Sequence, residues 1–286
     1  MAYGLQAFKE DGSSLFDTEK ICYGLIKSGY LQLVDRWGRY YRRSANLDPM
    51  EESSYGYMNL KDPISAITVT DTYSPIVFLV GDGKPCGESL SGNVRTLYFQ
   101  GCNPNTKAFV FDLMRDMGER SGMNIYNESS TLTFTSAMPP LNIVATIDAP
   151  ALAPVISPGS LTRFVPYDGA ANEISGQQWS SSDFAQVKGV IFVPVVSGEL
   201  ACCLTFSRAC ILQEGRDVPG SIGFARLTAE EGCGGTNNGI RFFFSPAPST
   251  IDQQFSNSYT AWSDIPTDRQ PQALVIRATD YPFPFR

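Results

Sequence analysis

The sequence predicts an all-β protein built from two tandem antiparallel β-sandwich domains with little helix. Three observations predict this fold: one pattern occurs twice in the chain, strand-like runs recur along it, and turn residues separate those runs. The chain has 286 residues, enough for two domains that each bury a core. Its 18 Phe and 13 Tyr favour strands, because aromatic side chains pack well on a half-buried pleated surface.

The repeated pattern relates the start of the chain to its middle at a constant spacing of 118 residues. It aligns residues 4–16 with residues 122–134, and residues 25–26 with residues 143–144. Small, apolar, polar and aromatic positions follow in the same order in both copies. Each copy is therefore predicted to be a strand, a polar turn and a return strand.

Further strands are predicted where apolar and β-branched runs stand between turn clusters. In chain order they are residues 64–70, 75–80, 96–99, 108–111, 190–193, 200–206, 240–244 and 273–277. Clusters of Gly, Pro and Asn predict turns at residues 81–85, 103–105, 232–239 and 245–248. Gly24 and the repeat favour a strand over a helix at residues 18–27.

A short helical linker is predicted at residues 111–120, between the two copies. This linker divides the chain into an N-terminal domain of residues 1–118 and a C-terminal domain of residues 119–286. The C-terminal domain has the longer loops, at residues 149–158 and 176–182, and insertions in loops are where function usually varies.

The composition excludes several classes of function. The chain has no histidine, which removes Ser-His and Cys-His nucleophilic pairs and the commonest ligand for zinc or iron. A net charge of −7 makes nucleic acid an unfavourable partner. No signal peptide and no membrane-spanning run is visible, so we expect a soluble chain made in the cytoplasm, without membrane insertion.

The seven cysteines are predicted to be buried, reduced thiols that behave as small hydrophobic side chains. None of them has the Cys-x-x-Cys spacing of a zinc or redox motif, and the acidic residues lack the spacing of a calcium loop. We therefore expect no cofactor, no metal site and no catalytic residues.

Tyr259 and Trp262 are the candidate contacts for a glycan or a protein partner, because they lie in an aromatic and polar stretch, residues 255–264. The alternative is that both side chains pack in the core. Glu230 and Glu231 are a weak candidate for one carboxylate of a glycosidase pair, and solvated charge in a glycine-rich loop is the simpler interpretation.

The two pattern starts resemble a family of tail proteins of bacteriophages and prophages. The motifs are Gly-Leu-x-x-Phe…Phe-Asp from residue 4, and Gly-Met-Asn-Ile-Tyr-Asn-Glu-Ser-Ser-Thr-Leu-Thr-Phe-Thr-Ser…Pro-Leu-Asn-Ile-Val from residue 122. In that family such a start heads a small β-sandwich in minor tail, tail-tip or baseplate proteins. The second copy departs from the family at Ser130, where glycine is usual.

The resemblance implies a structural virion protein, assembled in the host cytoplasm and located in the phage tail, with other tail proteins as partners. A homo-oligomer or a place in a ring is expected from the symmetry of tails. The alternative from another class is a non-catalytic carbohydrate-binding module that recognises host surface polysaccharide. A carboxylate-based glycosidase is a third, weaker hypothesis.

Overall fold

The computed structural model describes the chain at residues 6–8, 14–17, 20–42, 46–48, 50–118, 122–156, 161–175, 186–218, 221–247, 250–254 and 260–286. The described residues form nineteen strands and two 3-10 helices, so the predicted all-β fold is confirmed. In chain order the elements are β1 (Gln6–Phe8), β2 (Ser14–Asp17), β3 (Tyr23–Tyr30), β4 (Gln32–Arg42), η1 (Glu52–Ser54), β5 (Tyr55–Thr70), β6 (Ile76–Val80), β7 (Lys84–Ser91), β8 (Val94–Gln100), β9 (Lys107–Leu113), β10 (Asn124–Tyr126), β11 (Leu132–Thr135), β12 (Ala145–Asp148), β13 (Ala171–Ser175), β14 (Gln186–Leu204), β15 (Ala209–Val218), β16 (Ser221–Pro246), β17 (Thr250–Gln254), β18 (Ala261–Ser263), β19 (Gln272–Arg277) and η2 (Ala278–Asp280).

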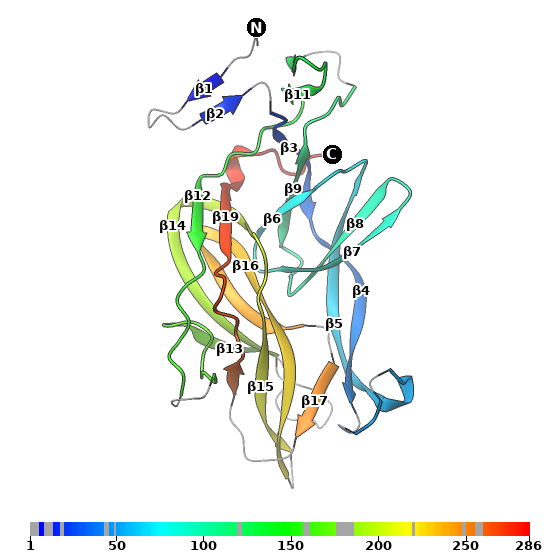
Figure 1. Cartoon of the computed structure of the whole chain (residues 1–286), viewed down its shortest axis with the longest axis vertical. Coiled ribbons are helices and arrows are strands. Elements are labelled where there is room, and N and C mark those ends of the chain that lie inside the picture. The colour runs from blue at the N-terminus through cyan, green and yellow to red at the C-terminus, as the bar shows by residue number, and fades with distance from the viewer. Residues whose placement is uncertain are drawn as a thin grey trace.

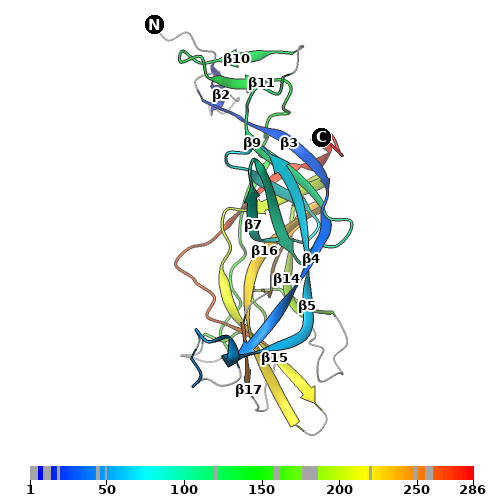
Figure 2. The same cartoon turned by 90° about the vertical axis from the view of Figure 1, so that its right-hand side faces the viewer.

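Two small hairpins carry the repeated pattern, as predicted. β1 pairs with β2, and β10 pairs with β11, each as a separate two-stranded sheet at one end of the elongated molecule (Figures 1 and 2). Paired residues in the two hairpins differ by 118: Gln6 faces Asp17, and Asn124 faces Thr135. Each hairpin also shifts its register at the same step, so the two have the same backbone pairing.

The strands after each hairpin repeat the same pairing. Lys27 of β3 faces Val110 of β9, and 118 residues after Lys27, Ala145 of β12 faces Val275 of β19. On the other side of these strands, β6 pairs with β9 and β14 pairs with β19 in matching register. We call residues 23–113 the first module and residues 145–277 the second module.

Each module is a β-sandwich whose two sheets have the same strand order. In the first module, β3-β9-β6 packs against β4-β5-β8-β7. In the second module, β12-β19-β14 packs against β13-β14-β16-β15, and β18 extends that second sheet. β14 serves both sheets, because its first part pairs with β13 and β16 and its last residues pair with β19.

The modules join edge to edge through β6 and β14. Leu79 of β6 faces Cys202 of β14 in an antiparallel pair. Cys202 is the counterpart of Val77, because Val77 faces Val110 in the first module and Cys202 faces the equivalent Val275 in the second. An antiparallel pair of equivalent strands has a local two-fold axis perpendicular to the sheet. Tyr23 and Leu141, which also differ by 118, meet at the outer edge of β3, where the Leu141 N–H donates to the Tyr23 carbonyl at 2.9 Å. The result is one central sheet with the order β12-β19-β14-β6-β9-β3.

One face of the central sheet carries the two module cores, and the other face carries a third apolar cluster. β9 shows why the run at 108–111 is apolar throughout: Ala108 and Val110 enter the first core, while Phe109 and Phe111 enter the third cluster. A strand buried on both faces is expected to be hydrophobic without alternation.

The C-terminal segment, residues 278–286, covers the third cluster by crossing from β19 to β3 (Figure 1). Its Tyr281 ring packs edge-on against Phe111 at a centroid distance of 5.0 Å. Phe285 pairs with Ser28 on the outer edge of β3 through two backbone hydrogen bonds of 2.9 and 3.0 Å. The C-terminal segment therefore packs its aromatic side chains on its own chain.

Two local predictions are wrong. Residues 114–118 after β9 have no helical structure. Residues 232–239, predicted as a turn cluster, lie inside β16, where glycine permits close approach of other backbone segments. A Cβ on Gly234 would overlap the Gly81 carbonyl, and a Cβ on Gly235 would overlap the Leu200 carbonyl.

Candidate functional site

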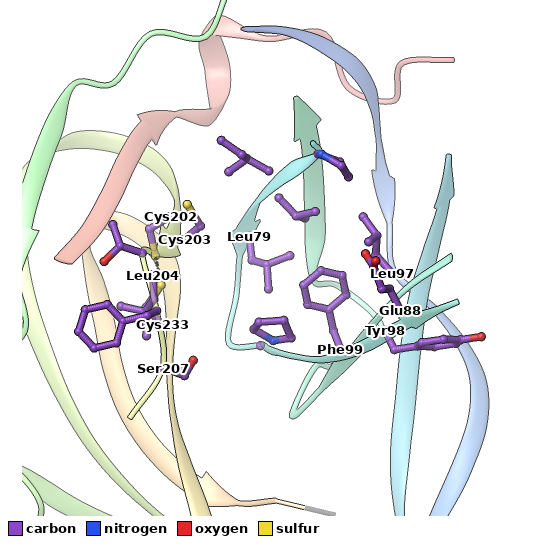
Figure 3. A pocket seen from close by; sticks show the side chains of 18 of the residues that line it. Leu79, Glu88, Leu97, Tyr98, Phe99, Cys202, Cys203, Leu204, Ser207 and Cys233 are labelled. Atoms are coloured by element: carbon purple, nitrogen blue, oxygen red, sulfur yellow. Dashed lines mark hydrogen bonds between the residues drawn. The ribbon is translucent and has the colours of Figure 1, made fainter. Parts of the chain in front are cut away.

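The strongest candidate site is a pocket between the two modules, beside the local two-fold axis. It has a volume of about 420 Å³. Figure 3 shows side chains of the first module and of the second module facing each other across it. The lining side chains include Leu79, Leu97, Phe99, Glu88 and Tyr98 from the first module, and Cys202, Cys203, Leu204, Ser207 and Cys233 from the second.

The pocket exists because two sandwich cores share one sheet. Leu79 and Leu204 are counterparts in the two modules, and both point from the central sheet into the gap between the cores. Phe99 and Leu97 form the wall on the side of the first module. The lining is mostly apolar, and Glu88, Tyr98 and Ser207 are its main polar side chains, which is the usual composition of a site that holds an apolar group.

Four of the cysteines that line or adjoin the pocket have a raised thiol pKa. Burial raises the pKa of Cys102 to about 12 and the pKa of Cys86 to about 11. Burial also raises the pKa of Cys203 and of Cys233, whose Sγ lies 3.2 Å from that of Cys202. Because the thiolate is the nucleophile, thiols held protonated by burial do not supply covalent catalysis.

The main buried polar group of the second module is an ionic network formed by Glu231, Arg208 and Tyr167. Arg208 donates to the two carboxylate oxygens of Glu231 at 2.7 and 2.8 Å, and the Tyr167 hydroxyl donates to the same carboxylate at 2.6 Å. Burial and the nearby carboxylate raise the pKa of Tyr167 well above its ordinary value. Burial opposes the charge of Arg208, but its hydrogen bonds to Glu231 and the attraction of the Glu231 charge together outweigh burial and raise the pKa of Arg208.

This network corrects the expectation that Glu230 and Glu231 are solvated charges in a loop. Both residues lie in β16, and Glu231 has no exposed surface, while Glu230 is half-buried at 3.7 Å from the Lys84 ammonium. A glycosidase needs two carboxyl groups that face each other across an open cleft. Glu231 is instead neutralised inside the core, so we assign it a structural role.

A second group of charges lies where the β6–β7 turn of the first module meets the second module. Asp82 forms ion pairs with Lys188 at 3.0 Å and with Arg241 at 3.2 Å. Arg241 also pairs with Glu173 at 2.7 Å. The buried Lys84 ammonium donates to the carbonyls of Ser245 and Pro246, both at 2.9 Å. These contacts fix the two modules relative to each other.

The two predicted contact residues have different outcomes. Trp262 lies in β18 with no exposed surface, its indole N–H donates to Asn172 at 3.1 Å, and its ring packs beside Phe244. This is the core-packing alternative, and it leaves no open indole face for a sugar. Tyr259 lies outside the described residues, so its predicted role as a contact stays a prediction.

The described residues contain no group of three or more Cys, Asp or Glu side chains that could hold a metal ion. In the same part of the chain, no helix is long and apolar enough to cross a bilayer. No known protein family, no curated protein and no solved structure matches this chain. Its function therefore has to be inferred from its own residues.

Sequence reasoning missed the pocket and the buried network, because both depend on residues far apart in the chain. Glu231 and Tyr167, for example, are separated by 64 residues. The repeat with a spacing of 118 residues could have indicated a site between the modules, because two copies of one sandwich in one chain have a contact surface between them. The sequence does not say which strands form that surface.

Proposed function

We propose that this chain is a structural protein of the virion of a tailed bacteriophage, located at the tail tip, the baseplate or the attachment of a fibre. Its role is to hold and dock other proteins, and it has no catalytic role. The observation that carries the proposal is the duplication itself: two sandwich modules, each headed by the same hairpin, fixed together about a local two-fold axis.

Three features support a docking role. Buried carboxylates are paired within the fold, as in the Glu231–Arg208 and Asp112–Arg115 pairs. Burial raises the pKa of Cys203 and of Cys233 in the pocket, which disfavours their thiolates. The resemblance of the two hairpin starts to phage tail proteins gives the location, and the tail proteins of that virion are the proposed partners.

Electron microscopy of intact virions tests this proposal. A small epitope tag placed in the exposed turn at Gly92-Asn93, between β7 and β8, can be labelled with an antibody fragment without disturbing either core. We expect label at the tail end of the particle, and virions that carry the untagged chain are the control. Tagged virions without tail label would contradict the proposal.

The structure does not favour recognition of a host glycan through Trp262, because its indole ring is buried and cannot stack on a sugar. A glycan array with the purified chain would show whether another surface, including the stretch around Tyr259, binds sugar.

A further inference from the structure

The outer edges of β3 and β12 are equivalent positions in the two modules, but only one of them has a strand partner among the described residues. On β3, Ser28 exchanges two backbone hydrogen bonds with Phe285, and its Oγ donates to the Pro282 carbonyl at 2.7 Å. On β12, the residue 118 positions later is Thr146, which is exposed. β12 is the last strand of the central sheet, and its described partner is β19 alone (Figure 1).

The backbone of Thr146 is oriented to accept a strand. Lys27 and Gly29 face β9, so the N–H and C=O of Ser28, between them, point away from β9 and reach Phe285. Ala145 and Ile147 face β19 in the same register, which turns the N–H and C=O of Thr146 outward. Unpaired groups on an outer strand are a template for an added strand.

The chain's own C-terminal segment does not fill both edges. Each chain has two equivalent edges and one such segment, so even exchange of segments between copies leaves one edge open per chain. The side chains around the two edges also differ. Equivalent positions are 118 residues apart in β3 and β12, and 165 residues apart in β9 and β19. The second module therefore has Asp148 in place of Tyr30, Leu274 in place of Phe109 and Gln272 in place of Lys107.

These replacements change which peptide the edge fits. At the β3 edge, Phe283 packs edge-on against Tyr30 at 5.0 Å, and the Lys107 ammonium lies 5.2 Å from the Phe283 ring. At the β12 edge, the corresponding place has the exposed carboxylate of Asp148 and the neutral amide of Gln272, which donates to that carboxylate at 2.8 Å. The first module has the neutral Tyr30 ring and a Lys107 ammonium already paired with Glu199 at 2.8 Å, whereas the second module has the Asp148 carboxylate. A basic residue therefore fits at the β12 edge, where Phe283 lies in the first module.

We infer that the outer edge of β12 binds an extended segment of a partner protein by strand addition. The segment has an apolar residue against Leu274 and a lysine or arginine beside Asp148. This inference deepens the proposed docking role and rests on it, because it names the surface through which one partner is held.

Fluorescence anisotropy with the purified full chain tests the inference. The probe is a labelled nine-residue peptide with the sequence of residues 278–286 in which the residue at the place of Phe283 is lysine, and the comparison peptide has the unchanged sequence. We expect saturable binding of the lysine peptide, at least about tenfold tighter than the unchanged peptide, since one added charge-assisted contact is worth about one factor of ten.

Three variants locate the binding. Thr146→Pro removes an outward N–H that the ladder does not use, so it should abolish binding without unfolding the protein. Thr146→Val is the matched control and should bind as the unchanged chain does. Asp148→Asn should remove the tenfold preference for lysine, and this result holds even if the proline variant does not fold.

No saturable binding up to about 1 mM peptide would overturn the inference, and would mean that Asp148 protects a bare edge against pairing. Binding that persists in Thr146→Pro would also overturn it, because the peptide would then be replacing the C-terminal segment at β3. Neither result affects the location of the chain in the virion, which the labelling experiment decides separately.

Discussion

Replacing Glu231 by alanine tests whether the buried ionic network holds the second module together. The Glu231 side chain has no exposed surface and that of Arg208 is 5% exposed, so the variant leaves a guanidinium charge in the core without its partner. Breaking a buried pair in this way costs about 3–5 kcal/mol. The Tyr167 hydroxyl also loses its acceptor, which adds about 1 kcal/mol.

The expected loss, about 4–6 kcal/mol, is a large part of the stability of a typical domain. With a urea m-value of about 3 kcal/mol/M, even 4 kcal/mol lowers the unfolding midpoint by about 1.3 M. The assay is urea unfolding followed by far-UV circular dichroism and by tryptophan fluorescence, since Trp262 lies in the same core as Arg208's stacking partner Phe244.

Two controls separate the network from its surroundings. Tyr167→Phe removes one hydrogen bond and should cost about 1 kcal/mol. Glu230→Ala removes the half-exposed neighbour, whose ion pair with Lys84 is 3.7 Å long, and should also cost about 1 kcal/mol or less. A Glu231→Ala midpoint no lower than that of Glu230→Ala would refute the assignment of Glu231 to a stabilising network.

Three further perturbations have outcomes set by the structure. Gly235→Ala places a methyl group on the Leu200 carbonyl and should lower the free energy of unfolding by about 2–3 kcal/mol. In the control Gly29→Ala, the added methyl group meets no atom within 4 Å, so the free energy of unfolding should change by less than about 0.5 kcal/mol. Urea unfolding midpoints compare the two variants. Tyr281→Phe removes a hydroxyl that donates to the Pro140 carbonyl at 3.1 Å and accepts from the Asn142 N–H at 2.8 Å, and should lower the free energy of unfolding by about 1–2 kcal/mol. Hydrogen exchange at the Ser28 amide should become faster, because Ser28 pairs with the same C-terminal segment. Unchanged exchange at Ser28 would contradict the role of that segment in holding the edge of β3. Folding raises the pKa of Cys86 and of Cys102 above that of a free thiol, so the contribution of each to stability is complete below about pH 8.5 and is lost as the pH rises toward 11 and 12. The more deeply buried Cys102 gives most of the fall, up to about 1.4 kcal/mol per pH unit, and the partly exposed Cys86 adds less because solvent screens it. Urea midpoints at about pH 8 and about pH 10 should show the fall, and Cys102→Ala should make it shallower.

The sequence predicted the fold where the cause is local. Period and turn chemistry placed the strands around residues 64–70 and 273–277, and the spacing of 118 predicted two hairpins that agree in register. The division at residue 118 stays a prediction, because the two halves share the central sheet.

The sequence misled where distant segments decide the structure. Glycines at 232–239 have the composition of a loop, but β16 needs them because the backbones of Gly81 and Leu200 pass against it. The sequence around Glu231 predicts a surface charge, whereas the structure buries this carboxylate against Arg208 and Tyr167. Trp262 lies among polar residues in the sequence, and only the sheet pairing of β18 with β15 shows that its side chain is internal.

The covalent link between the modules has a consequence for how this molecule behaves at low abundance. Two separate sandwiches that met only through a few short strand pairings and ion pairs would separate on dilution, whereas tethered partners experience an effective concentration in the millimolar range or above. Fusion therefore makes the pairing insensitive to expression level. It also frees the halves from having to stay identical, so that one edge could keep aromatic neighbours while its twin acquired a carboxylate.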